Sequence, residues 1–546
     1  MATLSDVSAA ARKLSFAIPP NHEEEYLALL GITDRAVAAV MAYPGTNKVH
    51  LGKAKTHYRR DYQIPVDEVK YPRKDIHQPL PEDNKLRGWA WKATIHGEPG
   101  GILEGKTVCF KDTVCVAKVP QLFGTTAIED FIPVSDATVV TRVLEQGGIV
   151  VGKAMCENLS HGPSSHSSPF GPVENPYAKG FSAGGSSSGC GALIGSGEVD
   201  MGVGGDQGGS IRIPASLCGL VGLKPTFGLV PYTGVLSSDS GLDTVGPMAQ
   251  TALDVALLLQ ATAGYDNIDD RQLGAPLPTG VPKYSELLLN GRKDGVKGLR
   301  IGILKEGFAS SSLDKAVDDK CRSAITKFVE LGATVEEVSV PLHLMAPHIN
   351  HILNKFGSSQ TRQGRQVSRR GLYVNEFWEK LIPWTQEKYE KAKYYVTGTA
   401  MSGEYGWSRY PTAYGRAMNL SRRLRDEYNT VLQDYDVIVM PTVPQPARRH
   451  VAYDAGPLAW AEASRSLTEN DLAGITSNTA ASSCTGHPSI TLPVGFVPPF
   501  SVDILQPEDL SIKLPCGLMA MAKMFDEATL INFADAFERA FNWKSL

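Results

Sequence analysis

The chain has 546 residues, which is long enough for a large core with one or two smaller domains. It carries 54 lysines and arginines against 58 aspartates and glutamates, a net charge of -4 without a dense basic stretch, so no nucleic acid is expected as a partner. The 8 cysteines include no C-x-x-C pair and predict reduced thiols in a cytoplasmic protein. No apolar signal region and no uncharged apolar run of about 18 residues is present, so neither export nor a membrane span is expected.

The first 85 residues are predicted to form an N-terminal helical domain. Three glutamates follow Asn21, and apolar residues then recur at helical spacing as far as Val40. A polar, proline-rich stretch at 62–83 is typical of a linker. Because the apolar stripe between Tyr26 and Val40 has to be buried, we expect this domain to form the interface of a twofold homodimer.

From Gly105 onward, short apolar runs alternate with amphipathic stretches. Strands are expected at 107–110, 149–152, 299–304, 333–340 and 436–439, and helices at 137–146 and 315–331. This alternation predicts an α/β core with helices on both faces of a sheet. We assign the core to residues 86–340 and 425–546. Between them, at 341–424, the strand pattern vanishes and aromatic residues accumulate, which predicts a helical insertion forming a small domain.

Glycine is concentrated in one strip, where it makes up twelve of the thirty residues from Gly180 to Gly209. Such density favours a loop that a ligand approaches closely. A phosphate-binding loop is disfavoured because no G-K-[ST] motif and no lysine or arginine occurs between Gly180 and Ile211. A nucleophile elbow centred on Ser187 matches G-x-S-x-G but lacks the apolar strand that should precede it.

Two other kinds of site were weighed against a catalytic loop. A metal site at His343, His348 and His351 is disfavoured because no carboxylate or cysteine lies at ligand spacing, so we expect neither a metal nor another cofactor. Histidine is the usual base for a serine, but His161 and His166 lie in a polar loop without an evident orienting carboxylate.

A lysine can serve as the base of a serine nucleophile if burial keeps its amine neutral. Lys111 fits this role because it ends the apolar run at 107–110, at the carboxyl end of a predicted strand. Open α/β sheets place their sites at that edge.

At this point the chain resembles the amidase signature hydrolases, from about Gly105 to the C-terminus. The resemblance rests on F-K-D-T around Lys111, G-G-S-S-S-G at 184–189 and D-Q-G-G-S at 206–210. It implies the family's fold, a mixed sheet flanked by helices, and hydrolysis of small carboxylic amides through a Ser-cisSer-Lys triad and an acyl-enzyme. Matched motif to motif, Lys111 is the base, Ser186 the bridging serine after a cis peptide bond, and Ser210 the nucleophile.

The resemblance also implies how the remaining residues of the strip act. The bridging serine passes a proton from the nucleophile to the lysine, so histidine is unnecessary. The oxyanion is expected to meet the backbone N–H groups of Gln207, Gly208, Gly209 and Ser210. Ser187 matches a family position that hydrogen-bonds around the triad, so a supporting role is expected for it. Asp206 and Arg212 flank the nucleophile position, and we expect them to form an ionic or hydrogen-bonded network that holds the loop, with contact to the substrate as the less favoured alternative.

Position 207 departs from the threonine or isoleucine of many family members. D-Q-G-G-S and the N-terminal extension are similar to the broad-specificity amidases associated with nitrile hydratases and to some urethanases. The expected substrate is a small-molecule amide or carbamate. A urethanase, an aryl acylamidase and, less favoured, the catalytic subunit of a tRNA-dependent amidotransferase stay open as alternatives, and the sequence does not choose among aliphatic amides, aryl amides, carbamates and esters.

Overall fold

The computed structural model describes residues 2–15, 17–42, 48–51, 55–58, 64, 66–452, 454–456, 459–460 and 474–546. The chain divides into two compact units, residues 1–65 and 66–546. Residues 66–85 belong to the second unit because β3 (Lys74–His77) pairs with β4 (Trp89–His96) of its sheet. Residues 74–77 of the expected linker therefore form a sheet edge, and residues 62, 63 and 65 lie outside the described residues.

The first unit contains two helices followed by a hairpin. The helices α1 (Leu4–Lys13) and α2 (Glu23–Ala42) agree with the prediction of helix here, but β1 (Lys48–Leu51) and β2 (Lys55–Tyr58) form an antiparallel pair. The prediction missed the hairpin because K-V-H-L and K-T-H-Y are too short for their alternation to outweigh a helical neighbourhood. Helix α2 leaves four large apolar side chains more than half exposed: Leu29, Ile32, Val37 and Val40.

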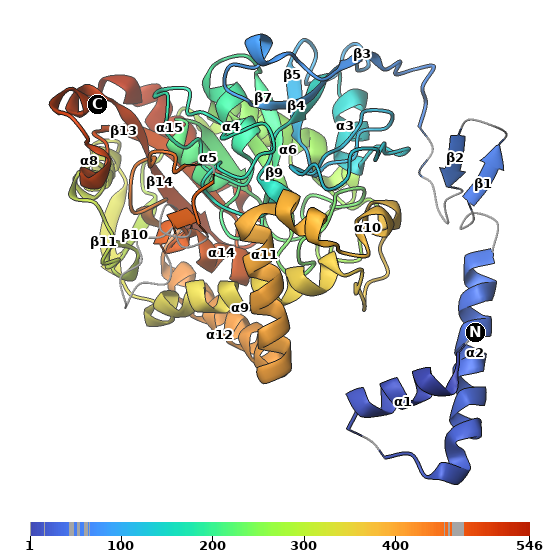
Figure 1. The fold of residues 1–546 in the computed structure, drawn as a ribbon. Coiled ribbons are helices and arrows are strands. Elements are labelled where there is room, and N and C mark those ends of the chain that lie inside the picture. The colour runs from blue at the N-terminus through green and yellow to red at the C-terminus, as the bar shows by residue number, and fades with distance from the viewer. Residues whose placement is uncertain are drawn as a thin grey trace. The chain divides into compact units, whose positions relative to one another are not determined.

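The second unit is built on one 12-stranded mixed sheet (Figure 1). In order across the sheet its strands are β11 (Thr334–Val338), β10 (Arg300–Leu304), β12 (Val437–Pro441), β14 (Leu514–Ala522), β13 (Ser489–Val497), β8 (Val221–Lys224), β9 (Thr244–Ala249), β7 (Met201–Asp206), β5 (Thr107–Lys111), β6 (Ile149–Ala154), β4 and β3. Pairing is parallel within β11-β10-β12 and within β7-β5-β6, and antiparallel elsewhere.

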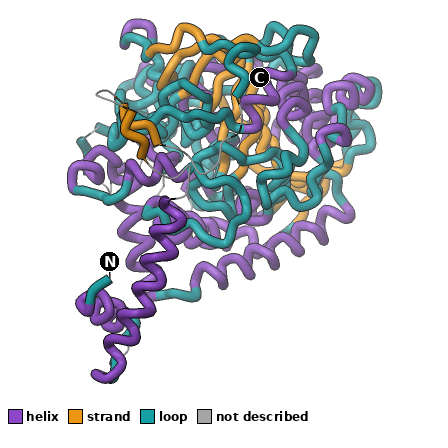
Figure 2. The backbone as a smooth tube through the Cα atoms, turned by 90° about the vertical axis from the view of Figure 1, so that its right-hand side faces the viewer, coloured by secondary structure: helices purple, strands orange, loops and turns teal. Residues whose placement is uncertain are grey.

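Helices cover both faces of this sheet, and Figure 2 shows the strands running through the interior of the second unit. The helices are α3 (Thr138–Glu145), α4 (Ser188–Gly195), α5 (Arg212–Leu217), α6 (Ala252–Thr262), α7 (Tyr284–Gly291), α8 (Lys315–Glu330), α9 (Ala346–Arg362), α10 (Asn375–Leu381), α11 (Gln386–Arg409), α12 (Ala413–Asp434), α14 (Thr479–Thr485) and α15 (Glu527–Ala540). No helix among the described residues is long and apolar enough to cross a bilayer.

Side-chain alternation along β14 shows how the core is divided between the two faces. Leu518 and Ala520 join a buried cluster with α3, α6, α7, α8 and α15. Met519 and Met521 point to the opposite face and join a cluster with α9, α12 and α14. A further cluster, on the face opposite Phe110 of β5, packs α4 and α5 against the sheet.

The predicted core elements are confirmed to within a few residues. Strands occur at 107–111, 149–154, 300–304, 334–338 and 437–441, and helices at 138–145 and 315–330. The α/β class with helices on both faces is confirmed as well. Residues 341–424 are helical, but their status as a separate small domain beside a core at 86–340 and 425–546 stays a prediction.

The glycine-rich strip is not the single loop that its composition suggested, because it contains α4 and the fully buried strand β7. Glycine is unfavourable inside helices and strands, so the packing of α4 and β7 in the core must outweigh this local preference. A Cβ atom at Gly202 would lie 2.8 Å from Sγ of Cys109 on β5 and 3.2 Å from Cδ1 of Ile194 on α4. Glycine at this position therefore lets α4 lie close against the sheet.

We expect Gly202→Ala to lower the midpoint of thermal unfolding, because an added methyl group in a filled core costs about 1–3 kcal/mol. The matched control is Gly398→Ala in α11, where a Cβ atom would meet nothing within 4 Å. Alanine in a helix is more stable than glycine by about 0.5–1 kcal/mol, so the control should raise the midpoint. Differential scanning fluorimetry of both variants checks the opposite signs, and a Gly202→Ala midpoint at or above that of the parent would contradict the packing argument.

Candidate active site

The site lies at the carboxyl edge of three adjacent parallel strands, β7, β5 and β6. Lys111 ends β5, Asp206 ends β7, and the segment after β6 leads to Ser160. Side chains alternate along β5, so Lys111 points to the same face as Cys109, which packs in the α4 and α5 cluster. The strand order and the alternation together bring the lysine to the glycine-rich strip.

Lys111 is completely buried. Its Nζ atom lies 2.7 Å from Oγ of Ser186, 2.9 Å from Oγ of Ser160 and 3.4 Å from the carbonyl oxygen of Gly205. The amine makes no ion pair with any described residue. Burial lowers the pKa of Lys111, because its charged form loses hydration.

The bridging-serine position is fixed by the backbone before α4. The peptide bond between Gly185 and Ser186 is cis, as the resemblance implies. The next residue, Ser187, donates its N–H group to the carbonyl oxygen of Ser210 at 3.3 Å, and its hydroxyl donates to the carbonyl oxygen of Gly205 at 3.2 Å. Ser187 therefore connects the strip's two serine clusters, and its supporting role stays a prediction.

Ser210 is only partly buried and lines a pocket. Its backbone lies against Ser187, but among the described contacts its hydroxyl makes no hydrogen bond to Ser186. The structure thus brings Lys111 and Ser186 into direct contact and leaves Ser210 one step away, where it lines the pocket. Catalytic hydrogen bonds in ligand-free enzymes are often long and shorten only when substrate binds.

The four N–H groups expected at the oxyanion are not equivalent. Gly209 donates its N–H group to Oδ1 of Asp206 at 2.8 Å, so this group is already engaged. The N–H groups of Gln207, Gly208 and Ser210 donate to no described residue. Gly209 has a φ of +133°, and a Cβ atom there would lie 2.5 Å from Oγ1 of Thr479, so the turn requires glycine.

Asp206 and Arg212 form a fully buried ion pair with Nη2–Oδ1 at 2.8 Å and Nε–Oδ2 at 3.0 Å. Burial alone would raise the pKa of Asp206, but the neighbouring guanidinium lowers it to about 2. Arg212 also donates to Ser482 and Ser483 on α14. The pair therefore connects the turn at 206–212 to α14.

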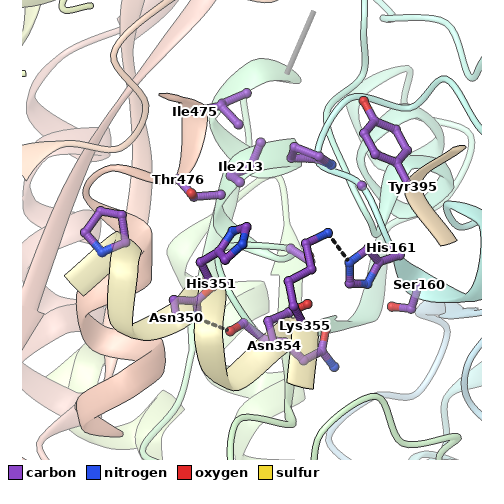
Figure 3. Close-up of a pocket in the computed structure, with 16 residues that line it drawn as sticks. Ser160, His161, Ile213, Asn350, His351, Asn354, Lys355, Tyr395, Ile475 and Thr476 are labelled. Carbon is purple, nitrogen blue, oxygen red and sulfur yellow. Dashed lines mark hydrogen bonds between the residues drawn. The ribbon is translucent and has the colours of Figure 1, made fainter. Parts of the chain in front are cut away.

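The pocket beside Ser210 has a volume of about 120 Å³. One wall is α9, which presents four polar residues (Figure 3): Asn350, His351, Asn354 and Lys355. Asn350 donates to the carbonyl oxygen of Gln207 at 2.9 Å and so connects this wall to the turn before the nucleophile position. Ser160, His161 and Tyr395 line the opposite side.

His161 and His351 were considered from the sequence only as a disfavoured base and a disfavoured metal ligand, and the other residues of this pocket wall were missed, although a signal existed. Asn350, His351, Asn354 and Lys355 follow an i, i+1, i+4, i+5 pattern, which places polar side chains on one face of a helix. That this helix face packs against the turn at 206–212 depends on tertiary structure, which the sequence pattern does not show. Ser160 and its loop carried no recognisable pattern.

The histidines weighed earlier have different environments. His343 is buried and contacts Tyr428 and Asn478, whereas His351 lines the pocket. His161 contacts Nζ of Lys355 at 3.1 Å. Burial lowers the pKa of His166 to about 3, so it is neutral near pH 7.

The comparisons with known proteins agree with this geometry. The model of the Amidase family matches residues 72–531. An enantioselective amidase of Rhodococcus rhodochrous is 35% identical over 474 residues, covering 85% of this chain and 84% of that protein. A glutamyl-tRNA(Gln) amidotransferase subunit of Exiguobacterium sibiricum is 34% identical over 444 residues, covering 80% and 84%. The solved structure of a peptide amidase from Stenotrophomonas maltophilia has a TM-score of 0.59 at 27% identity, covering 81% and 83%.

The family match begins within the second unit, two residues before β3, and extends into α15. It therefore includes almost the whole mixed sheet and every residue of the site. The resemblance inferred from F-K-D-T and the glycine-rich strip is confirmed, as is the fold that it implied. The chain belongs to the amidase signature family and is a hydrolase that acts on the C–N bonds of amides.

Proposed function

We propose that this enzyme hydrolyses small carboxylic amides to the acid and ammonia or an amine, through an acyl-enzyme on Ser210. Lys111 is the base and Ser186 the bridging serine. The observation that carries the proposal is the buried lysine, whose amine lies 2.7 Å from Ser186 and has no ion-pair partner among the described residues. Burial lowers the pKa of this amine and so favours the neutral form that the relay needs to accept a proton.

The steps follow from the donors and acceptors at the site. Ser210 gives its proton to Oγ of Ser186 as it attacks the carbonyl carbon, and Ser186 gives its own proton to Lys111. When the tetrahedral intermediate collapses, Lys111 returns the proton through Ser186 to the leaving nitrogen. Water then attacks the ester on Ser210 by the same relay and releases the acid.

The negative oxygen of the intermediate is stabilised by the N–H groups of Gln207, Gly208 and Ser210. We leave Gly209 out of this role, because its N–H group donates to Asp206. Asn350 and Thr479 do not bind the oxyanion themselves. They hold the turn by donating hydrogen bonds to the carbonyl oxygens of Gln207 at 2.9 Å and Gly208 at 2.6 Å. With both carbonyls fixed, the amides stay oriented for the oxyanion before substrate binds.

The pocket volume favours a short acyl group. The pocket provides about 120 Å³ beside Ser210 and is open to solvent. We therefore take a short aliphatic acyl group as its first candidate occupant. A carbamate hydrolase or an aryl acylamidase remains the alternative, because either would use the same relay.

An amidotransferase subunit is the second alternative. Amidases and amidotransferase subunits match this chain at nearly equal identity, so identity does not separate them. The N-terminal helices and the aromatic segment at 341–424 favour an enzyme that works without partner subunits. The 8 free cysteines support action in the cytoplasm.

The first prediction concerns the relay. Phenylmethylsulfonyl fluoride should sulfonylate Ser210, and Lys111→Ala should slow that labelling by several orders of magnitude while the fold survives. Lys111→Arg should be equally slow, because a guanidinium does not give up its proton. Mass spectrometry of the peptide containing Ser210 measures the rate, and circular dichroism checks the fold.

Two results would contradict the relay. An adduct on Ser187 would restore the nucleophile-elbow interpretation, since Ser187 is the centre of the G-x-S-x-G match. Fast labelling of Lys111→Arg would show that no neutral amine is needed at this position.

The second prediction concerns the substrate. In a panel of acetamide, benzamide, acetanilide, ethyl carbamate and L-glutamine, acetamide should give the highest kcat/KM, because its acyl group fits the pocket. Release of ammonia or amine is the readout, and Ser210→Ala is the inactive control. A preference for ethyl carbamate would favour a urethanase, and a preference for glutamine would favour an amidotransferase subunit.

The third prediction concerns the proposed homodimer. In the proposed dimer, the exposed apolar face of α2 is buried between the two chains. A charge at its centre should prevent this, so Ile32→Glu should convert a dimer with twice the chain mass of 58.8 kDa into a monomer. The matched control is Leu273→Glu in the second unit, at a leucine that is also exposed. Light scattering at micromolar concentration gives the mass, and a monomeric parent protein would rule the dimer out.

A further inference from the structure

The base of the proposed relay has a third hydroxyl partner that the Lys-Ser-Ser relay does not use. Oγ of Ser160 lies 2.9 Å from Nζ of Lys111 and 3.0 Å from Oγ of Ser186, and Lys111 and Ser186 are 2.7 Å apart. The three polar atoms form a closed triangle. Lys111 and Ser186 are completely buried, and Ser160 is 7% exposed.

A neutral Lys111 amine has two N–H donors and one acceptor. In the triangle each group can donate once and accept once: Lys111 donates to Ser160, Ser160 to Ser186, and Ser186 to Lys111. The second N–H of the amine points to the carbonyl oxygen of Gly205 at 3.4 Å. This ring leaves the proton of Ser186 directed at the lone pair of Lys111, as the relay requires.

A protonated Lys111 has three N–H donors and no acceptor. The same surroundings supply three oxygen acceptors, from Ser160, Ser186 and Gly205. Without the hydroxyl of Ser160 a buried ammonium group would have two. Hydrogen bonds to charged groups are the stronger ones, so this acceptor matters most when the proton is on the lysine.

The backbone holds this hydroxyl in place at a conformational cost. Leu159 and Ser160 have φ values of +47° and +59°, which is unusual for consecutive residues other than glycine. Ser160 donates its N–H group to the carbonyl oxygen of Glu157 at 2.8 Å, and Leu159 donates to Phe123 at 2.9 Å. The turn after β6 is thus built to point Ser160 at the base.

The other ionisable groups that influence the amine do not replace this acceptor. The thiols of Cys156 and Cys190 and the carboxylates of Asp206 and Asp243 lie nearby, but none contacts Lys111 among the described residues. Burial raises the pKa of Cys156, and each carboxylate faces an arginine of its own.

We infer that Ser160 is a positioning residue of the relay, which orients the proton of Ser186 toward neutral Lys111 and is the third acceptor for protonated Lys111. The inference rests on the proposed function, because it assigns a partner to the proposed base.

The test follows the sulfonylation of Ser210 by phenylmethylsulfonyl fluoride as a function of pH. In Ser160→Ala and Ser160→Gly the rate should fall roughly 10- to 150-fold, the value of one hydrogen bond to a charged group. The acidic limb of the profile should also move to lower pH. Losing this acceptor destabilises the ammonium form more than the neutral amine, because hydrogen bonds from a charged donor are stronger, and this lowers the pKa of Lys111 further.

Ser160→Gly removes the hydroxyl without straining the backbone, because glycine adopts a φ near +59° readily. It therefore separates the loss of the hydroxyl from a change in the turn. The matched control is Ser165→Ala, in the same loop. Ser165 is also buried at positive φ, +56°, and its hydroxyl donates to the carbonyl oxygen of Val173 at 2.8 Å. The acidic limb of this control should stay in place.

A rate within about twofold of the parent in both Ser160 variants, or an acidic limb that does not move, would overturn the inference. If Lys111→Ala is unlabelled in the same experiment, the proposed function survives that result. Rapid labelling of Lys111→Ala would overturn the proposed function and this inference together.

Discussion

The site depends on one constraint. Lys111 is completely buried, and among the described residues no carboxylate forms an ion pair with its amine. Two carboxylates lie close by in sequence or space, but each is taken. Asp112 follows Lys111 in the chain and pairs with the buried amine of Lys153 at 3.0 Å, and Asp206 pairs with Arg212 at 2.8 Å. These two internal pairs leave Lys111 with hydroxyl and carbonyl oxygens only, and burial without a counter-charge lowers the pKa of its amine.

The strands that position Lys111 differ in how well they could be predicted from the sequence. The strand that ends in Lys111 was predictable, because T-V-C-F is a short apolar run before a polar turn. Its neighbour β7, M-G-V-G-G-D, was not, because glycine has low strand preference. The glycine at 202 is explained only by the side chains of Cys109 and Ile194 that a Cβ atom would meet, and these contacts exist only in the folded sheet.

The same division applies to the site itself. Lys111, Ser186 and Ser210 were proposed from motifs whose spacing is specific, and the structure places Lys111 against Ser186 and the backbone of Ser210 against Ser187. Ser160 was missed because one serine in a polar loop has no pattern, and its role arises from a positive φ and from strand order. The engagement of Gly209 by Asp206 was missed for a similar reason, since the local turn decides which N–H groups remain available.

Chemistry and substrate choice come from separate parts of this fold. The proposed base, bridging serine and nucleophile are carried by β5 and the strip around α4 and β7, whereas α9 forms a wall of the pocket through its polar face. The link between them includes the contact of Asn350 with the carbonyl oxygen of Gln207. Because that contact uses a backbone oxygen, the wall residues around it can change without altering the relay. Identity measured over the whole chain reports mainly the shared core, so amidases and amidotransferase subunits can match it almost equally while differing in what enters the pocket.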